Sequence, residues 1–332
     1  MSTTGPLAVG VTPMETRRDV IVALAQEAER AGYSAFFVGE GWGHDAGVLL
    51  SEVALRTRHL TLGTGVLNVW GRSAGGIALL ATSLDDVSGG RFVLGLGAGS
   101  PALAEGLHDV AFHAPVRRLG TVTRQVRRLL DGEGIEPTVA SGVRPVRLAV
   151  RPERAVPIHL AALGTAAVRL TGETADGWCP FLLPRSQLGG RRALLNEAAD
   201  AAGRPAPVAV NPSIPLAVSP DAEAAAELTD WWLRFYLTRM GPLYPRMLRD
   251  AGLGEAVDQV IAGAGADRSE GRTAPPPELA DEVILTGHPA AVEAALTGWR
   301  EAGADMPILV LPPGRPLDTL LDMIRSLAPG TA

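Results

Sequence analysis

LTLGTGVLNVWGRSAGGIALLATSLDDVSGGRFVLGLGAGS, residues 60–100, is the stretch that decides the fold. It holds two short apolar runs, Leu60–Val66 and Phe92–Gly97, which are both rich in glycine toward their ends. Between them, apolar residues recur at helical spacing over 77–84, and Ser-Gly-Gly at 88–90 ends that segment. The stretch predicts a strand, a helix and a strand. Glycine at the strand ends either lets a ligand approach the backbone or only serves tight turns.

The same alternation extends over the rest of the 332-residue chain. Continuous apolar runs are typical of strands that are buried on both faces of a parallel sheet. The eight predicted strands are Leu7–Thr12, Ala35–Glu40, Leu60–Val66, Phe92–Gly97, Pro157–Ala162, Trp178–Leu183, Val208–Val218 and Met306–Leu311. Eight such repeats favour a (β/α)8 TIM barrel, with an open doubly wound sheet as the alternative. No break in composition divides the chain, so we expect a single domain over residues 1–332.

Helices are predicted between these strands from their apolar spacing. They cover residues 17–31, 48–57, 120–130, 165–174, 185–202 and 222–240, with a last helix over 292–302. Two segments are expected to be insertions or loops, residues 132–156 and 241–280. The first is rich in Gly, Pro and Arg and could hold a small hairpin, and residues 263–277 have the composition of a mobile loop.

Composition excludes several kinds of chemistry. The chain has no lysine, which excludes a Schiff base and a Walker-type phosphate lysine. A single cysteine, Cys179, excludes an internal disulfide and a cysteine-ligated iron–sulfur cluster, and its apolar context predicts an inert thiol. The net charge of −6 and the lack of a long basic run argue against nucleic acid as a partner. We see neither a membrane-spanning run nor a secretion signal, so we expect a cytoplasmic protein without a membrane partner.

In a barrel of this kind, function gathers at the carboxyl ends of the strands. These ends are mostly glycine-bearing and poor in charge, which suits a mouth that holds a flat cofactor against backbone groups. They comprise Glu40–Asp45, Gly65–Asn68, Gly97–Ser100, Ala161–Thr165 and Cys179–Leu182.

One of these ends passes directly from a strand into a helix, at Gly164 and Thr165. A helix N-terminus offers unpaired N–H groups and partial positive charge, so it can hold a phosphate without lysine. A plain strand–helix junction is the alternative. The run Gly95–Gly99 is similar to part of a dinucleotide fingerprint, but it follows the fourth strand rather than the first.

The second strand ends in a dense polar cluster, Glu40-Gly41-Trp42-Gly43-His44-Asp45. A histidine could pass a proton near neutral pH, and a neighbouring carboxylate could orient it. His44 and Glu40 are therefore the candidate catalytic residues. The alternative is a structural cluster in which Asp45 caps the next helix.

Several segments resemble the bacterial-luciferase-like superfamily. SLDDVSGGRFVLGLG at 83–97 resembles the signature of that superfamily, and RHLTLGTGV at 58–66 resembles the segment before it. Residues 157–162 with LTGETADGW at 170–178 resemble the fifth strand, its helix and the entry to the sixth strand. Residues 286–309 resemble the closing helix and strand, so the likeness extends over most of the chain.

The resemblance implies a luciferase-like barrel that binds FMN or coenzyme F420, a deazaflavin, at the mouth. Glu40–Asp45 resembles the branch of F420-dependent oxidoreductases, whereas flavin monooxygenases more often carry a Glu-His-His run there. In that branch a non-prolyl cis peptide would fall on Gly65-Val66. The cofactor-binding residues implied are Trp42, Asp45, Gly65, Val66, Asn68, Gly97, Ala98, Gly99, Ser100, Ala161, Ala162, Gly164 and Thr165. Phosphate contacts would fall on the last four.

The sequence thus predicts an F420-dependent oxidoreductase that transfers hydride to or from a small organic substrate, as a homodimer. An FMN-dependent monooxygenase is one alternative, and a catalytically silent flavin-binding or structural barrel is another. The segment around Arg72-Ser73-Ala74 lacks a proline common in the branch, and the segment after Ser100 departs from it, so the substrate class stays open. Arg234 and Arg239 lie on the aromatic helix over 222–240, which leaves an anionic substrate possible.

Overall fold

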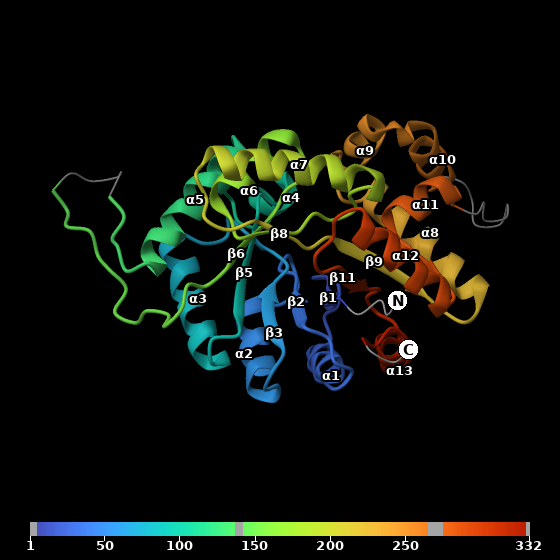
Figure 1. The fold of residues 1–332 in the computed structure, drawn as a ribbon, viewed down its shortest axis with the longest axis horizontal. Coiled ribbons are helices and arrows are strands. Elements are labelled where there is room, and N and C mark those ends of the chain that lie inside the picture. Colours follow the sequence, from blue (N-terminus) through green and yellow to red (C-terminus); the bar gives the residue numbers. More distant parts are fainter. Residues whose placement is uncertain (1–4, 137–141, 265–274, 330–332) are drawn as a thin grey trace.

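The computed structural model describes residues 5–136, 142–264 and 275–329 (Figure 1). Its strands form one sheet in which every pairing is parallel. The strands are β1 (Ala8–Val11), β2 (Ala35–Val38), β3 (Thr61–Thr64), β4 (Leu67–Asn68), β5 (Phe92–Gly97), β6 (Ile158–Ala161), β7 (Gly177–Trp178), β8 (Ala209–Val210), β9 (Ser213–Val218), β10 (Leu285–Gly287) and β11 (Ile308–Leu311).

The sheet closes on itself through one bent segment, residues 209–218. Its first part, β8, pairs with β7, and its second part, β9, pairs with β11. Pro212 has no N–H to donate and lies at the break between the two parts. Beside the break, the N–H of Ser213 donates to the Pro180 carbonyl at 2.8 Å. The (β/α)8 TIM barrel predicted from the sequence is therefore confirmed. Among the described strands, β10 pairs only with β9 and lies outside the eight strands of the barrel.

Most observed strands fall within the predicted ranges, but β4 and β10 lie outside all of them, and one predicted range needs correction. β7 ends at Trp178, so most of the predicted range 178–183 is not strand. Beyond Trp178, Phe181 forms a single bridge with Ser213. Two prolines, at 180 and 184, interrupt the backbone donors that a longer strand would need.

Helices surround the barrel (Figure 1). They are α1 (Arg18–Arg30), α2 (Ala46–Arg56), α3 (Ala74–Ser88), α4 (Pro101–Ala104), α5 (Pro115–Leu130), α6 (Thr165–Thr174), α7 (Arg185–Ala201), α8 (Ala222–Thr238), α9 (Leu243–Leu248), the π-helical turn η1 (Arg249–Leu253), α10 (Gly254–Ala264), α11 (Pro277–Val283), α12 (Pro289–Glu301) and α13 (Leu317–Ser326).

Two helix predictions need correction. The helix expected over 120–130 begins at Pro115, which occupies the first turn where its missing N–H costs nothing. The helix over 292–302 is not the last, because α13 follows β11. Leu320, Met323 and Ile324 are buried on one face of α13, at the spacing of an amphipathic helix.

The two segments expected as insertions differ in structure. The described parts of residues 132–156 contain no strand, so the hairpin is not observed there, and Figure 1 shows them extending away from the body. Residues 241–280 contain α9, η1 and α10 and the start of α11, helices that the sequence analysis did not predict. Most of the loop expected over 263–277 lies outside the described residues.

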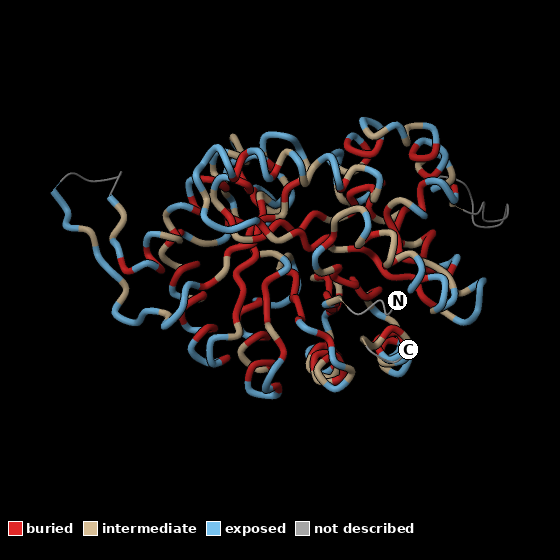
Figure 2. The backbone as a smooth tube through the Cα atoms, viewed as in Figure 1, coloured by how far each residue is buried: buried red, intermediate tan, exposed pale blue. Residues whose placement is uncertain are grey.

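Apolar side chains fill the layer between the strands and the helices, as the burial of the strands in Figure 2 shows. A second, smaller cluster includes Phe37, Val93 and Cys179. Cys179 is buried, and burial raises the pKa of its thiol to about 12. That pKa keeps the thiol protonated near neutral pH, which fits the predicted inert cysteine. No described helix has the length and hydropathy needed to cross a membrane.

Candidate active site at the barrel mouth

The structure brings four of the predicted site segments onto neighbouring strands. Asn68 of β4 pairs with Gly97 of β5, and Gly97 in turn pairs with Ala161 of β6. The N–H of Glu40 points to the carbonyl of Val66 at 3.4 Å. The peptide bond Gly65-Val66 is cis, as the family resemblance implies. The carboxyl ends of these strands therefore form one continuous edge.

Glu40 and Asp45 are joined by Arg72, which lies before α3. The Arg72 guanidinium donates to both carboxylate oxygens of Glu40 and to Oδ2 of Asp45. Hydrogen bonding to Glu40 is the main cause that raises the pKa of Arg72. The side chain of Glu40 is only 8% exposed, so the Arg72 guanidinium supplies a charged partner to a nearly buried carboxyl group.

The same two carboxylates also begin α2. Oδ1 of Asp45 accepts from the N–H groups of Gly47 and Val48, at 2.8 and 3.1 Å. Oε2 of Glu40 accepts from the Ala46 N–H at 3.0 Å. The capping role considered for Asp45 is thus observed, and both carboxylates have structural partners.

His44 differs from its acidic neighbours because one side of its ring is free. Its Nε2 lies 2.9 Å from the Thr16 carbonyl, so Nε2 carries the proton and donates it. Nδ1 is then an acceptor, and no described residue donates to it. Two residues before His44, Trp42 is 50% exposed and offers an indole surface. Within the polar cluster, His44 is the residue with a free proton-accepting atom.

Asn68 orients a second histidine that the sequence analysis did not select, His108. Oδ1 of Asn68 accepts from the N–H groups of Trp70 and Gly71 at 3.0 and 2.8 Å, which fixes the direction of its amide. Nδ2 of Asn68 therefore donates to Nε2 of His108, 3.3 Å away. His108 then carries its proton on Nδ1. His108 follows α4 in a segment without clear periodicity, so no sequence signal marked it.

Residues 97–100 face the β4 side of the mouth. A Cβ on Gly97 would lie 2.7 Å from Cγ2 of Val66, so only glycine fits beneath that side chain. Gly99 has a φ of 63°, the left-handed region that glycine adopts without strain. The Ala98 carbonyl accepts from the indole of Trp70 at 2.6 Å, and Ser100 caps α4 through Leu103.

The predicted phosphate position lies at the start of α6. Gly164 stands at the N-cap without a side-chain cap, and no atom lies within 4 Å of where its Cβ would be. Arg191 of α7 donates to Oγ1 of Thr165 at 3.0 Å and adds a guanidinium that the sequence analysis missed. The Ala162 carbonyl is already bound by the indole of Trp178 at 2.8 Å. Open N–H groups beside a cation can hold an anion.

A family model described as luciferase-like monooxygenase matches residues 2–306. The chain belongs to this family. A protein of Mycobacterium tuberculosis whose name proposes a coenzyme F420-dependent oxidoreductase is 28% identical over 90% of this chain and 92% of its own. A 4-hydroxyprotoasukamycin monooxygenase of Streptomyces nodosus subsp. asukaensis is 31% identical over 71% of this chain and 70% of its own.

Among solved structures, the coenzyme F420-dependent tetrahydromethanopterin reductase of Methanopyrus kandleri superposes with a TM-score of 0.78. It covers 97% of both chains at 17% identity, and that likeness supports the fold. The resemblance seen in the sequence is confirmed, and the chain is an enzyme of the luciferase-like monooxygenase family.

One polar residue of this luciferase-like barrel lies below the mouth and apart from the cluster. His159 of β6 is 7% exposed, and its Nδ1 has no hydrogen-bond partner. A Cβ on Gly177 would lie 2.4 Å from Cδ2 of His159, so the imidazole ring fills the space beside that glycine. Burial lowers the pKa of His159 to about 4, so the imidazole is neutral at pH 7. No group of metal-ligating side chains occurs among the described residues.

Proposed function

We propose that this enzyme transfers hydride between coenzyme F420 and a small organic substrate at the barrel mouth. The observation that carries a phosphate-bearing redox cofactor is the anion site at the start of α6, beside strand ends poor in charge. The relative from Mycobacterium tuberculosis, matched over nearly its whole length, supports F420 as the cofactor.

The residues present fit the deazaflavin in two respects. The uncapped N–H groups at Gly164 and Thr165, with Arg191, would hold its phosphate. Side chains of Phe37, Val66 and Asn68 pack in the space beside Gly65, Gly97 and Gly99, so a flat ring would lie over the cis peptide Gly65-Val66 rather than in the place of a side chain. When bound, the deazaflavin supplies the carbon that carries the hydride.

We assign the proton-transfer role to His44 rather than to Glu40. Nδ1 of His44 is free to accept or return a proton of the substrate, while Thr16 holds the ring in one orientation. Glu40 is held by Arg72 and by the N–H of Ala46, so it anchors the cluster instead of exchanging protons. Trp42 would add an apolar wall to the cofactor position.

An FMN-dependent monooxygenase is the second candidate. The family description and the Streptomyces relative, which is named as a monooxygenase, favour it. An FMN phosphate would use the same anion site, so the two candidates differ in the ring rather than in the phosphate. The homodimer and the cytoplasmic location expected from the sequence remain proposals.

Titration of the purified protein with F420 and, separately, with FMN tests the proposal by fluorescence quenching. We expect F420 to bind more tightly than FMN. Tight FMN binding without F420 binding would contradict the F420 assignment and leave the monooxygenase candidate.

Variants separate the two parts of the site. Arg191→Gln should weaken binding of the cofactor about ten-fold or more, because a charge-assisted hydrogen bond to phosphate is lost. Arg56→Gln, which removes the same charge at the far end of α2, is the matched control and should bind normally. His44→Ala should bind F420 as the natural protein does but lose turnover, and unchanged turnover would remove His44 from the mechanism.

A further inference from the structure

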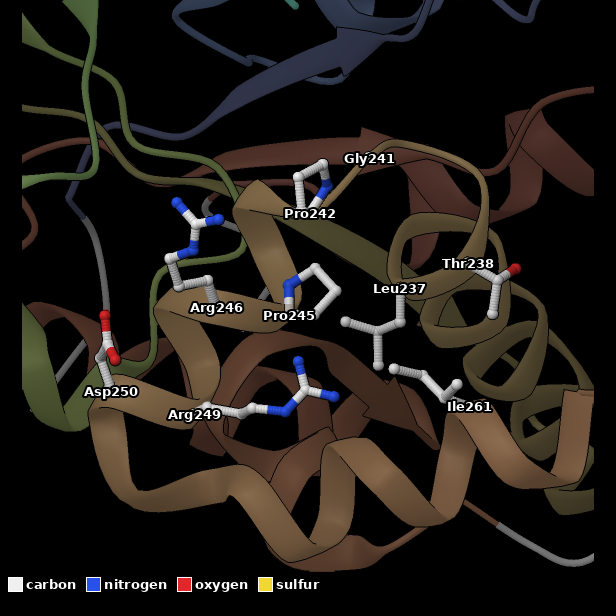
Figure 3. Close-up of a pocket in the computed structure, with 9 residues that line it drawn as sticks. All are labelled: Leu237, Thr238, Gly241, Pro242, Pro245, Arg246, Arg249, Asp250 and Ile261. Atoms are coloured by element: carbon white, nitrogen blue, oxygen red, sulfur yellow. The ribbon is translucent and has the colours of Figure 1, made fainter.

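A pocket outside the mouth lies where α8, α9, η1 and α10 meet (Figure 3). Its volume is about 420 Å3, within the range of small-molecule sites. None of the candidate mouth residues lines it. The proposed function therefore gives this pocket no role.

The pocket combines apolar walls with two guanidinium groups. Leu237, Pro245 and Ile261 supply the apolar walls, and Arg246 and Arg249 supply the cations. Figure 3 shows the Arg249 side chain extending between η1 and the apolar residues of α8 and α10. An apolar cavity with a few polar groups is the usual composition of a ligand site.

The two arginines differ in how they are held. Arg249 donates through Nε and Nη2 to Oδ1 of Asp258, at 3.2 and 2.5 Å. That pair fixes the Arg249 guanidinium and leaves its Nη1 without a partner among the described residues. Arg246 is exposed and has no side-chain hydrogen bond or ion pair with any described residue, so its guanidinium is open to a ligand. By contrast, Arg234 of α8 is bound to Asp230 at 2.5 Å.

A planar guanidinium matches a carboxylate with two parallel hydrogen bonds. One carboxylate of the chain, Asp250, also lines the pocket, but it forms no ion pair with Arg246. With Arg249 paired to Asp258, Arg246 and Asp250 are the charged side chains of the lining that have no ion pair with a described residue, so a ligand carboxylate would bind on the arginine side of the pocket. The apolar walls suit an organic body attached to that charge.

The pocket is also joined to the mouth by aromatic rings in edge-to-face contact. Tyr244 directly precedes Pro245, and its ring lies 6.0 Å from Phe181 and 5.5 Å from Tyr236. Phe181 follows β7 and bridges to β9, so the wall of the pocket is anchored at the rim of the barrel. A ligand in the pocket would therefore lie beside the mouth and behind an aromatic wall.

We propose that this pocket is a second binding site, which takes the carboxylate of an organic monoanion on Arg246 and Arg249. Calorimetric titration of the cofactor-free protein with benzoate, and with benzyl alcohol as an uncharged analogue, tests it. We expect benzoate to bind at about millimolar concentration or below, and benzyl alcohol to bind at least about ten-fold more weakly. Equal binding of the two probes, or no benzoate binding, overturns the proposal.

Variants locate the site. Arg246→Gln should weaken benzoate binding about ten-fold or more. Arg239→Gln removes the same charge from an exposed position just after α8, outside the pocket lining, and should bind benzoate normally. His44→Ala should also leave benzoate binding unchanged, and F420 binding by Arg246→Gln should match the natural protein. Loss of benzoate binding in His44→Ala, or an unaffected Arg246→Gln, would place benzoate elsewhere and overturn the assignment.

Discussion

At the scale of single residues, the mouth is a set of side chains whose partners decide what each can do. Glu40 and His44 are four positions apart in the sequence and looked equally suited to proton transfer. Arg72, distant in sequence, separates their roles by pairing with Glu40. The sequence could locate the polar cluster but not this pairing, because the contact forms only when the loops after β2 and β4 meet.

The first prediction concerns that pairing. Arg72→Gln leaves the nearly buried carboxylate of Glu40 without its cation, and we expect a loss of roughly 2 kcal/mol in the free energy of unfolding. In the double variant Glu40→Gln with Arg72→Gln the nearly buried unpaired charge is gone and only the half-exposed Asp45 lacks its cation, so the double variant should be more stable than Arg72→Gln alone. Urea unfolding measures both, and a double variant no more stable than the single one would show that the charge pairing is unimportant.

The second prediction concerns His159. Its pKa of about 4 in the folded protein lies below the ordinary value of 6.5, so the unfolded chain binds the proton more readily. The contribution of the neutral His159 imidazole to the free energy of unfolding is therefore complete above pH 6.5, and it is lost as the pH falls toward 4. The loss should reach roughly 3 kcal/mol. Urea unfolding of the natural protein and of His159→Gln between pH 4 and 7 measures it, and parallel pH dependences would contradict the prediction.

The third prediction concerns His108. Nitrogen-15 NMR of protein labelled in histidine should show His108 with its proton on Nδ1, because Asn68 donates to Nε2. Asn68→Ala removes that donor and should shift the tautomer toward Nε2–H. A His108 signal that is insensitive to Asn68→Ala would mean that the amide does not orient the ring.

At the scale of elements, the predictable parts are those with strong local signals. The strand β5 is observed with the bounds that the sequence predicts, and α6 also. α3 ends at Ser88, and the next residue, Gly89, has a φ of 68°, the left-handed region expected of a glycine after a helix. The helices over 243–264 were missed because one proline and three glycines there mask the apolar spacing.

The fourth prediction compares two glycines with equal space and different backbone. No atom lies within 4 Å of a Cβ on Gly89 or on Gly190. Gly89→Ala must adopt the left-handed region and should cost about 1 kcal/mol in the free energy of unfolding. Gly190→Ala lies inside α7 and should instead stabilise by up to about 1 kcal/mol. Thermal and urea unfolding give both values, and equal signs would contradict the account of the helix end.

At the scale of the whole molecule, the count of strands and their alternation with helices made the barrel predictable. The way it closes was not, because one segment, residues 209–218, pairs with β7 at its start and with β11 and β10 at its end. Such staggered pairing depends on strand tilt, which short-range patterns do not encode. The pocket beside α9 could not be predicted from the sequence either, because its walls come from four separate elements.

The most direct test of the central claim is a crystal structure of the enzyme with F420 bound. We predict the phosphate at the start of α6, in contact with Arg191 and the N–H groups near Thr165, and the deazaflavin against Gly65-Val66 and Gly97. His44 should then face the open side of the ring. F420 bound away from these strand ends, or a phosphate that leaves Arg191 and α6 untouched, would contradict the account.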